Sequence, residues 1–252
     1  MVVMSRWLSG DLRPAVAWRR VFFALLLWSV LPASGVAAEV SPFSAWVSKG
    51  WVLEKSINGD LDADGVDDAV LVLQQNDRRK LKHNEGLGAS ELNTNPRRLL
   101  VLLKSADGYR KVADNARFLP PQNDEDAPCL EDPLEEGGVT VSRGLLRIDL
   151  HYWLSCGSWG VSHSSFLFRL EDGRLRLIGL DGYEFMRNSG DRSESSINFL
   201  TGKKKITTGL SQFDEPTTPK VKWEKFPARK PIYLDQMGAS CDEGDPAHSW
   251  CQ

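Results

Sequence analysis

The chain has 252 residues, of which 41% are apolar and 26% are charged, a mixture that excludes a disordered chain, a collagen or a coiled coil. The length suits one domain. The formal net charge of −3 argues against a nucleic-acid-binding protein, because such proteins carry a strong basic excess. Nine tryptophans favour aromatic-rich sheets or an aromatic binding surface.

The first 38 residues have the features of a secretory signal peptide. Arg19 and Arg20 precede the apolar run 21–30, and the small residues at 36–38 fit a cleavage site. An uncleaved anchor is the alternative, but this run is shorter than the roughly 20 residues that span a bilayer. We therefore expect residues 1–38 to be removed, with no stable membrane span afterwards. Residues 39–252 then form a β-rich domain that is periplasmic or secreted by a bacterium.

Past one short helix, expected over residues 42–50, the chain consists of short apolar runs separated by turns. Asp-Gly pairs at 107–108 and 172–173 fall between such runs and indicate β-hairpins, and another pair follows at 181–182. The runs that predict strands are residues 69–73, 99–103, 109–112, 139–154, 164–170 and 174–180.

Residues 145–154 alternate between apolar and other side chains, as expected of a half-buried strand, and residues 139–186 predict an antiparallel meander. The polar segments 76–97 and 119–137 predict long loops, and the lysines of 221–226 suit an edge strand. The predicted fold is mostly β, a single-domain antiparallel sheet meander with one short N-terminal helix and long loops. In residues 145–154 one face carries Leu146, Ile148, Leu150, Tyr152 and Leu154, and the other carries Arg147, Asp149, His151 and Trp153.

Four cysteines follow the predicted signal peptide, and an even number in an exported protein indicates disulfides. A zinc site is disfavoured because no two of them are spaced as in C-x-x-C. Three pairings are open, of which we predict Cys129–Cys156 and Cys241–Cys251. The second closes a short loop, and the first ties the loop 119–137 to the end of a predicted strand.

Residues 60–68 read D-x-D-x-D-G-x-x-D, with carboxylates at positions one, three, five and nine and a glycine at six. The aspartates of this loop repel one another unless a cation neutralises them, and Ca²⁺ takes six to eight oxygen ligands in flexible geometry. The loop is not an EF-hand, because position twelve is Leu71 and not a bidentate glutamate. The alternative is a solvated acidic turn. The predicted ligands of one calcium ion are Asp60, Asp62, Asp64, the Val66 carbonyl and Asp68.

The spacing of this loop, and the strand that follows it, resemble the calcium loops of FG-GAP or VCBS-type repeats over about residues 52–73. The resemblance implies the same five ligands. The chain has one copy and lacks the FG and GAP signatures, so a single loop is implied and not a full propeller. The chain also resembles a group of uncharacterised secreted bacterial proteins that share this loop, a central meander and a stretch similar to Ser196–Lys203, SINFLTGK.

These features predict an exported, non-enzymatic protein, stabilised by calcium, that binds an envelope protein or a glycan. One alternative is a periplasmic hydrolase that uses the His151–His163 region, although no G-x-S-x-G elbow is present. The other is a carbohydrate-binding module that uses Trp153 and Trp159. A cleft that joins histidine and carboxylate favours the hydrolase, and an exposed row of tryptophans favours the sugar-binding module. The serines considered for the hydrolase are Ser155, Ser158 and Ser164.

Overall fold

The computed structural model describes residues 41–213, 216–225 and 230–238. The chain divides into two units, Met1–Ser41 and Pro42–Gln252, and every described strand belongs to the second. The predicted signal peptide and the predicted Cys241–Cys251 disulfide lie outside the described residues. The described residues are mostly β, in antiparallel sheets, as the sequence predicts. No helix among them has the length and apolar character needed to cross a membrane.

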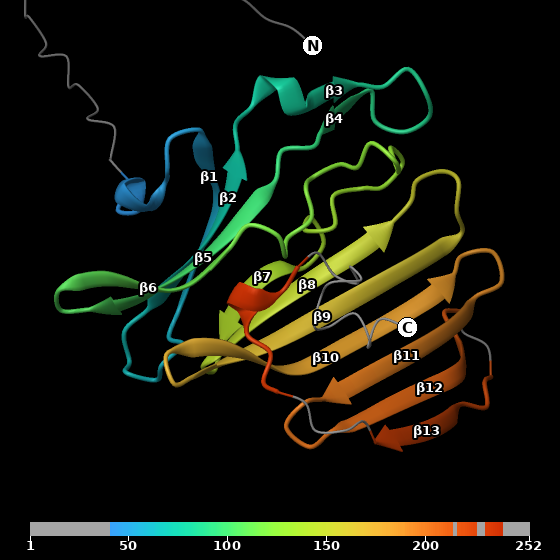
Figure 1. The fold of residues 1–252 in the computed structure, drawn as a ribbon. Helices are drawn as coiled ribbons and strands as arrows, with labels where there is room; N and C mark the ends of the chain where they lie inside the picture. Colours follow the sequence, from blue (N-terminus) through green and yellow to red (C-terminus); the bar gives the residue numbers. More distant parts are fainter. Residues whose placement is uncertain (1–40, 214–215, 226–229, 239–252) are drawn as a thin grey trace, which may run out of the picture. The chain divides into compact units, whose positions relative to one another are not determined.

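The smaller sheet has four antiparallel strands in the order β1-β2-β5-β6 (Figure 1). Its central strands are almost wholly buried because both faces of the sheet are covered. Side chains of β2 alternate between two apolar clusters, which explains why its sequence is a continuous apolar run. The strands are β1 (Trp51–Gly59), β2 (Asp68–Gln75), β5 (Arg97–Ser105) and β6 (Gly108–Asn115).

The segment before β1 covers one face of the smaller sheet. It contains a single 3₁₀ turn, η1 (Ser44–Trp46), which is shorter than the helix expected over 42–50. Phe43 is buried in the cluster on that face, and Trp46 packs against the same cluster. These two side chains are three residues apart, so one turn with about three residues per turn directs both toward the sheet.

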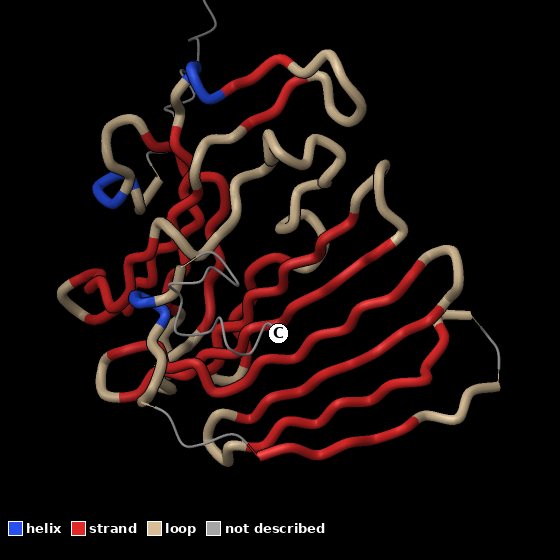
Figure 2. Tube along the Cα trace, turned by 45° about the vertical axis from the view of Figure 1, so that its right-hand side comes forward, coloured by secondary structure: helices blue, strands red, loops and turns tan. Residues whose placement is uncertain are grey.

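The larger sheet has seven antiparallel strands in the order β13-β12-β11-β10-β9-β8-β7, so neighbours in the sheet are also neighbours in the sequence (Figure 2). This is the predicted meander, and β13 is its predicted lysine-rich edge. The strands are β7 (Gly138–Ser142), β8 (Leu145–Trp153), β9 (Gly160–Glu171), β10 (Arg174–Met186), β11 (Asp191–Asn198), β12 (Lys203–Ser211) and β13 (Lys220–Lys225).

Two local predictions from the sequence differ from the structure. The Asp-Gly pair at 181–182 does not turn the chain but lies inside β10, because β9 and β11 pair with this strand on both sides. The segment 76–97 is not only a loop. It holds a 3₁₀ turn, η2 (Arg78–Lys80), and a small hairpin of β3 (Leu81–His83) and β4 (Glu91–Asn93).

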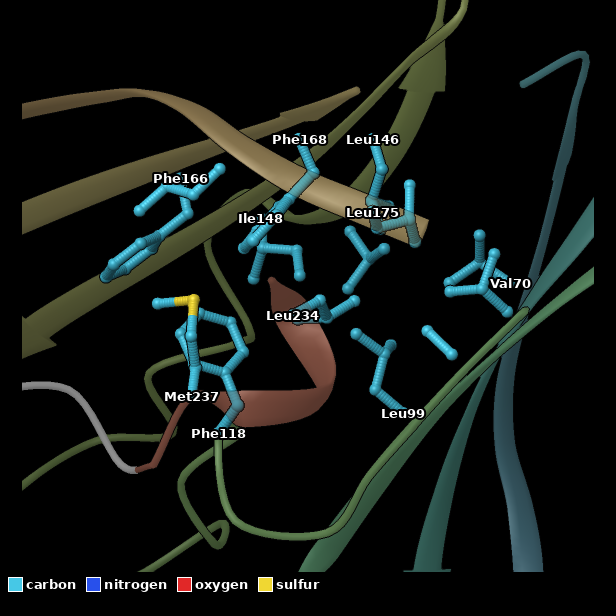
Figure 3. Packing of buried hydrophobic residues seen from close by; sticks show 14 of the residues in the cluster. Val70, Leu99, Phe118, Leu146, Ile148, Phe166, Phe168, Leu175, Leu234 and Met237 are labelled. Atoms are coloured by element: carbon cyan, nitrogen blue, oxygen red, sulfur yellow. The ribbon is translucent and has the colours of Figure 1, made fainter. Parts of the chain in front are cut away.

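The main hydrophobic core contains residues of both sheets (Figure 3). Val70 and Leu99 come from the smaller sheet, and Leu146 and Phe168 come from the larger one. The short segment around η3 (Leu234–Gln236) packs into the same core. Its carbonyl groups at Leu234 and Met237 accept hydrogen bonds from Asn115 Nδ2 at 2.5 and 2.8 Å, so the last described residues are tied to β6.

The loop 119–137 is held to the sheets by a buried cation and a disulfide. Arg97 on β5 is only 1% exposed and forms ion pairs with Glu54 on β1, at 2.5 Å, and with Asp132 in the loop, at 2.6 Å. Burial lowers the pKa of Arg97, but its hydrogen bonds to the two carboxylates raise it more, so the guanidinium stays charged. The predicted disulfide Cys129–Cys156 is confirmed, and it joins this loop to the chain after β8.

Candidate functional site

The acidic loop connects β1 to β2 and is folded by hydrogen bonds to its own carboxylates. Asp60 accepts hydrogen bonds from the backbone N–H of Ala63 at 2.6 Å and of Gly65 at 2.9 Å. Gly65 has φ +84°, a left-handed conformation that glycine adopts without steric cost. The turn therefore wraps the backbone around the first carboxylate.

Three of the predicted ligands converge. Asp60, Asp62 and Asp68 each present a carboxylate oxygen, and these oxygen atoms all lie within 4.8 Å of one another. Asp64 is not part of this group, and its Oδ1 accepts the backbone N–H of Val66 at 2.7 Å. The structure thus brings three of the four predicted carboxylates together on one side of the loop.

The loop is anchored to both sheets. Asp68 is 1% exposed, and its two oxygens accept the backbone N–H groups of Leu61 at 2.9 Å and of Lys104 on β5 at 2.8 Å. Leu61 is buried in the main core. A Cβ at Gly59 would lie 2.6 Å from Val141 Cγ1, so a glycine lets β1 pass close to β7 of the other sheet. The acidic loop therefore lies where the two sheets meet.

The negative charges of the loop repel one another. Burial raises the pKa of Asp62, and the nearby charges of Asp68, Asp64 and Asp60 raise it further. The hydrogen bond from the backbone N–H of Asp64 has the opposite effect and lowers this pKa. A bound cation would remove the repulsion by neutralising the carboxylates.

A second candidate site lies on the outward face of the larger sheet, away from the main core. The alternation predicted for β8 is confirmed, because Leu146, Ile148 and Leu150 are buried in the core. The other side chains of β8 therefore lie on the outward face. The strand register places two rows of polar and aromatic side chains across this face. One row is Asp149, Ser165, Asp181, Ser196, Lys205 and Trp223, and the next is His151, His163, Tyr183, Glu194, Thr207 and Val221.

These rows enclose a hollow of about 290 Å³ over β8 to β12. Small side chains form its floor: Ser165 is 3% exposed and Thr207 is 8% exposed, although both lie on the outward face. Its rim carries two cationic and two anionic side chains. They are Arg147, Lys205, Asp181 and Glu194.

His163 lines the hollow from β9. Its Nε2 lies 3.4 Å from Asp149 Oδ1, and its ring stacks on Tyr183 with centroids 4.9 Å apart. Burial lowers the pKa of His163 below its ordinary 6.5, the charge of Asp149 raises it, and the charge of His151 lowers it. The lowered pKa favours the neutral form of this imidazole, although a carboxylate lies beside it.

The serines considered for a hydrolase are not brought to this histidine. Ser155 Oγ donates to the Cys129 carbonyl at 3.0 Å, and Ser158 Oγ accepts the N–H of Gly160 at 3.0 Å. Ser164 lies opposite Leu150 on the inward face of the sheet. Within β9, the serine on the same face as His163 is Ser165, two residues away, and the alternation of side chains along a strand is the signal that could have found it.

The two tryptophans considered for sugar stacking share one cation. The guanidinium of Arg187 lies 4.1 Å from the ring centroid of Trp153 and 5.6 Å from that of Trp159. Arg187 also donates to the carbonyls of Leu154 and Ser158 at 2.6 Å. Trp159 is 59% exposed, whereas Arg187 covers part of Trp153. Trp223, 64% exposed on β13, is a more open ring beside the hollow.

Comparison of the chain with protein-family models, with curated proteins and with solved structures finds no match.

Proposed function

We propose that this chain is an exported, non-enzymatic binding protein whose domain is stabilised by one calcium ion. The observation that carries the proposal is the convergence of Asp60, Asp62 and Asp68 oxygens within 4.8 Å, on a loop that is hydrogen-bonded to β5 and packed into the core by Leu61. Carboxylate oxygens are the ligands that Ca²⁺ prefers, and its coordination number of six to eight leaves places for further oxygens. Asp64, the Val66 carbonyl and water supply the remaining ligands.

Calcium in this loop would act on the domain and not on a substrate. Asp68 links the loop to β5, and Leu61 links it to the core. Without a cation, the repulsion among the carboxylates favours opening of the turn that starts β2. Neutralising that repulsion would hold the β1–β2 connection at the place where the sheets meet.

The export proposal is supported by the predicted signal peptide and by the disulfide. The first 38 residues fit a signal peptide, and the Cys129–Cys156 disulfide suits an oxidising compartment such as the periplasm. The binding role is supported by the outward face of the larger sheet, which carries the hollow described above. Candidate partners are an envelope protein or a glycan.

Thermal unfolding in calcium and in chelator tests the calcium proposal. Free calcium at a hundredfold excess over Kd stabilises the folded state by about 2.7 kcal/mol, which raises Tm by several degrees. Magnesium should raise Tm less, because it requires a tight octahedral site.

The matched variants are D62A and D67A, two aspartates of the same loop. Asp62 belongs to the converging group and Asp67 does not. We expect D62A to lose most of the calcium-dependent rise in Tm and D67A to retain it. A Tm that does not respond to calcium, or equal responses of the two variants, would contradict the calcium site.

A hydrolase is the second candidate, and the observation that favours it is the 3.4 Å contact between His163 Nε2 and Asp149 Oδ1. A base oriented by a carboxylate is one part of a nucleophilic site. Ser165 lies on the same face and opposite Asp149 in the neighbouring strand, so it is the nucleophile to test. Covalent labelling by a fluorophosphonate that is lost in S165A would favour the hydrolase over the binding protein.

A further inference from the structure

We infer that the hollow on the outward face of the larger sheet binds a neutral oligosaccharide. This inference rests on the binding role proposed above and names the class of ligand. The hollow, at about 290 Å³, is just below the ligand-site range of about 300 to 1,000 Å³. It therefore suits one or two sugar units of a chain that continues over the open sheet.

The rim offers hydrogen-bonding groups that the protein leaves unused. Within the described ranges, no hydrogen bond or ion pair engages the side chains of Asp181, Ser196, Lys205 or Thr207. Asp181 on β10 pairs with Ser196 on β11, and Ser196 pairs with Lys205 on β12. A carboxylate acceptor, a hydroxyl group and an ammonium donor thus lie along one line across three strands, and the hydroxyl of Thr207 lies in the next row.

The charge of the rim disfavours a strongly charged ligand. Arg147 and Lys205 oppose a cation, and Asp181 and Glu194 oppose an anion. His163, which also lines the hollow, adds no charge when its imidazole is neutral. A sugar hydroxyl donates and accepts at once, so a neutral polyhydroxylated ligand can use both kinds of rim group without leaving a buried charge unpaired.

The aromatic ring that a sugar can contact lies at the edge of the hollow, because the ring of Tyr183 inside it is covered. The ring of Tyr183 is covered by neighbours on both sides. His163 on β9 stacks on it, and the guanidinium of Arg192 on β11 lies 4.5 Å from its centroid. Trp223 is 64% exposed and pairs in register with Lys205. Its ring is therefore the one that a sugar's C–H face can contact beside the hollow.

Isothermal titration of the full chain, purified from a secreting host in excess calcium, tests the inference with four named probes. Maltotetraose, cellotetraose and tetra-N-acetylchitotetraose are neutral, and tetragalacturonate is their anionic counterpart. We expect at least one neutral probe to bind, and to bind more tightly than tetragalacturonate. Removing a charged hydrogen-bonding partner in D181A or K205A should weaken that binding by about tenfold or more.

Two controls lie on the same strands but on the opposite face. E184A is matched to D181A on β10, and K204A is matched to K205A on β12. Both controls should bind the sugar as the unmodified chain does. W223A should weaken binding less than K205A, because its ring lies at the edge of the site.

Three results would overturn the inference: no binding of any neutral probe, preference for tetragalacturonate, or equal weakening in the rim variants and their controls. A rise in Tm with calcium, together with no binding of any neutral probe, would contradict the sugar site and support the calcium site. Binding of a neutral probe, together with a Tm that does not respond to calcium, would support the sugar site and contradict the calcium site.

Discussion

The two sheets of this domain differ in what covers them. The smaller sheet is packed on both faces, by the larger sheet on one side and by the segment around η1 on the other. The larger sheet packs one face into the core and leaves the outward face of β8 to β12 to form a polar hollow. Both are antiparallel, so the difference comes from burial and not from strand direction.

This difference decides where chemistry can be placed. In a strand that is buried on both faces, such as β2, a charged side chain must leave water, which costs free energy unless hydrogen bonds satisfy it, as they do for Asp68 at the start of β2. A strand that is buried on one face has every second position free for polar groups. The smaller sheet accordingly carries its acidic loop at a strand end, whereas the larger sheet carries its polar groups along the strands.

The largest effect should come from a charge in the doubly covered sheet. R97A leaves Glu54 and Asp132 without the guanidinium that pairs with both, and should cost about 3–5 kcal/mol of stability. R98A is the matched control on the next residue, where a partly exposed guanidinium pairs with Asp114 and should contribute at most about 1 kcal/mol. Urea unfolding measures both. Equal losses would show that burial does not separate the two arginines.

The disulfide should rank second. Replacing Cys129 and Cys156 by serine releases a cross-link between residues 27 apart in sequence, and should cost about 3 kcal/mol. The loss reflects the freedom regained by the unfolded chain, so it should appear as a lower urea midpoint with little change in the native circular dichroism spectrum. A midpoint that does not change on reduction would contradict a stabilising cross-link.

A smaller, pH-dependent effect should come from His163 on the open face. Burial lowers its folded-state pKa below 6.5, so the unfolded chain binds a proton more readily than the folded one. The stability contributed by the neutral ring is therefore complete above pH 6.5 and is lost as pH falls toward the folded-state pKa. The Tm of H163Q should fall less than that of the unmodified chain between about pH 7 and 5. A parallel fall in the two proteins would contradict this assignment.

The smallest effect on stability should come from the rim of the hollow. D181A removes an exposed carboxylate that has no partner in the described residues, and should change stability by no more than about 0.5 kcal/mol. Thermal unfolding checks this. A loss as large as that of R97A would mean that the outward face is part of the folding core, and the contrast between the two sheets would fail.

The sequence by itself determined the β class, the meander and the lysine-rich edge, whereas it left three cysteine pairings open, of which the predicted Cys129–Cys156 pair is the one that the structure contains. These features are local or nearly so, since they follow from alternation, turn residues and short spacings. The acidic loop was also visible in the sequence, because its ligands lie within nine residues. Its convergence involves Asp68, whose position depends on a hydrogen bond from Lys104 on another strand.

Only the tertiary structure decided which residues share the open face. Asp149, Asp181 and Lys205 come from separate strands, and the pairing register alone places them in one row. The Asp-Gly pair at 181–182 is compatible with a turn in the sequence, but pairing with β9 and β11 on both sides holds it inside β10. Arg97 likewise falls at the end of the polar segment 76–97, which the sequence predicts to be a loop, and its two carboxylate partners are 43 and 35 residues away in the chain. Local preferences decide the elements, but contacts between distant segments decide which side chains meet.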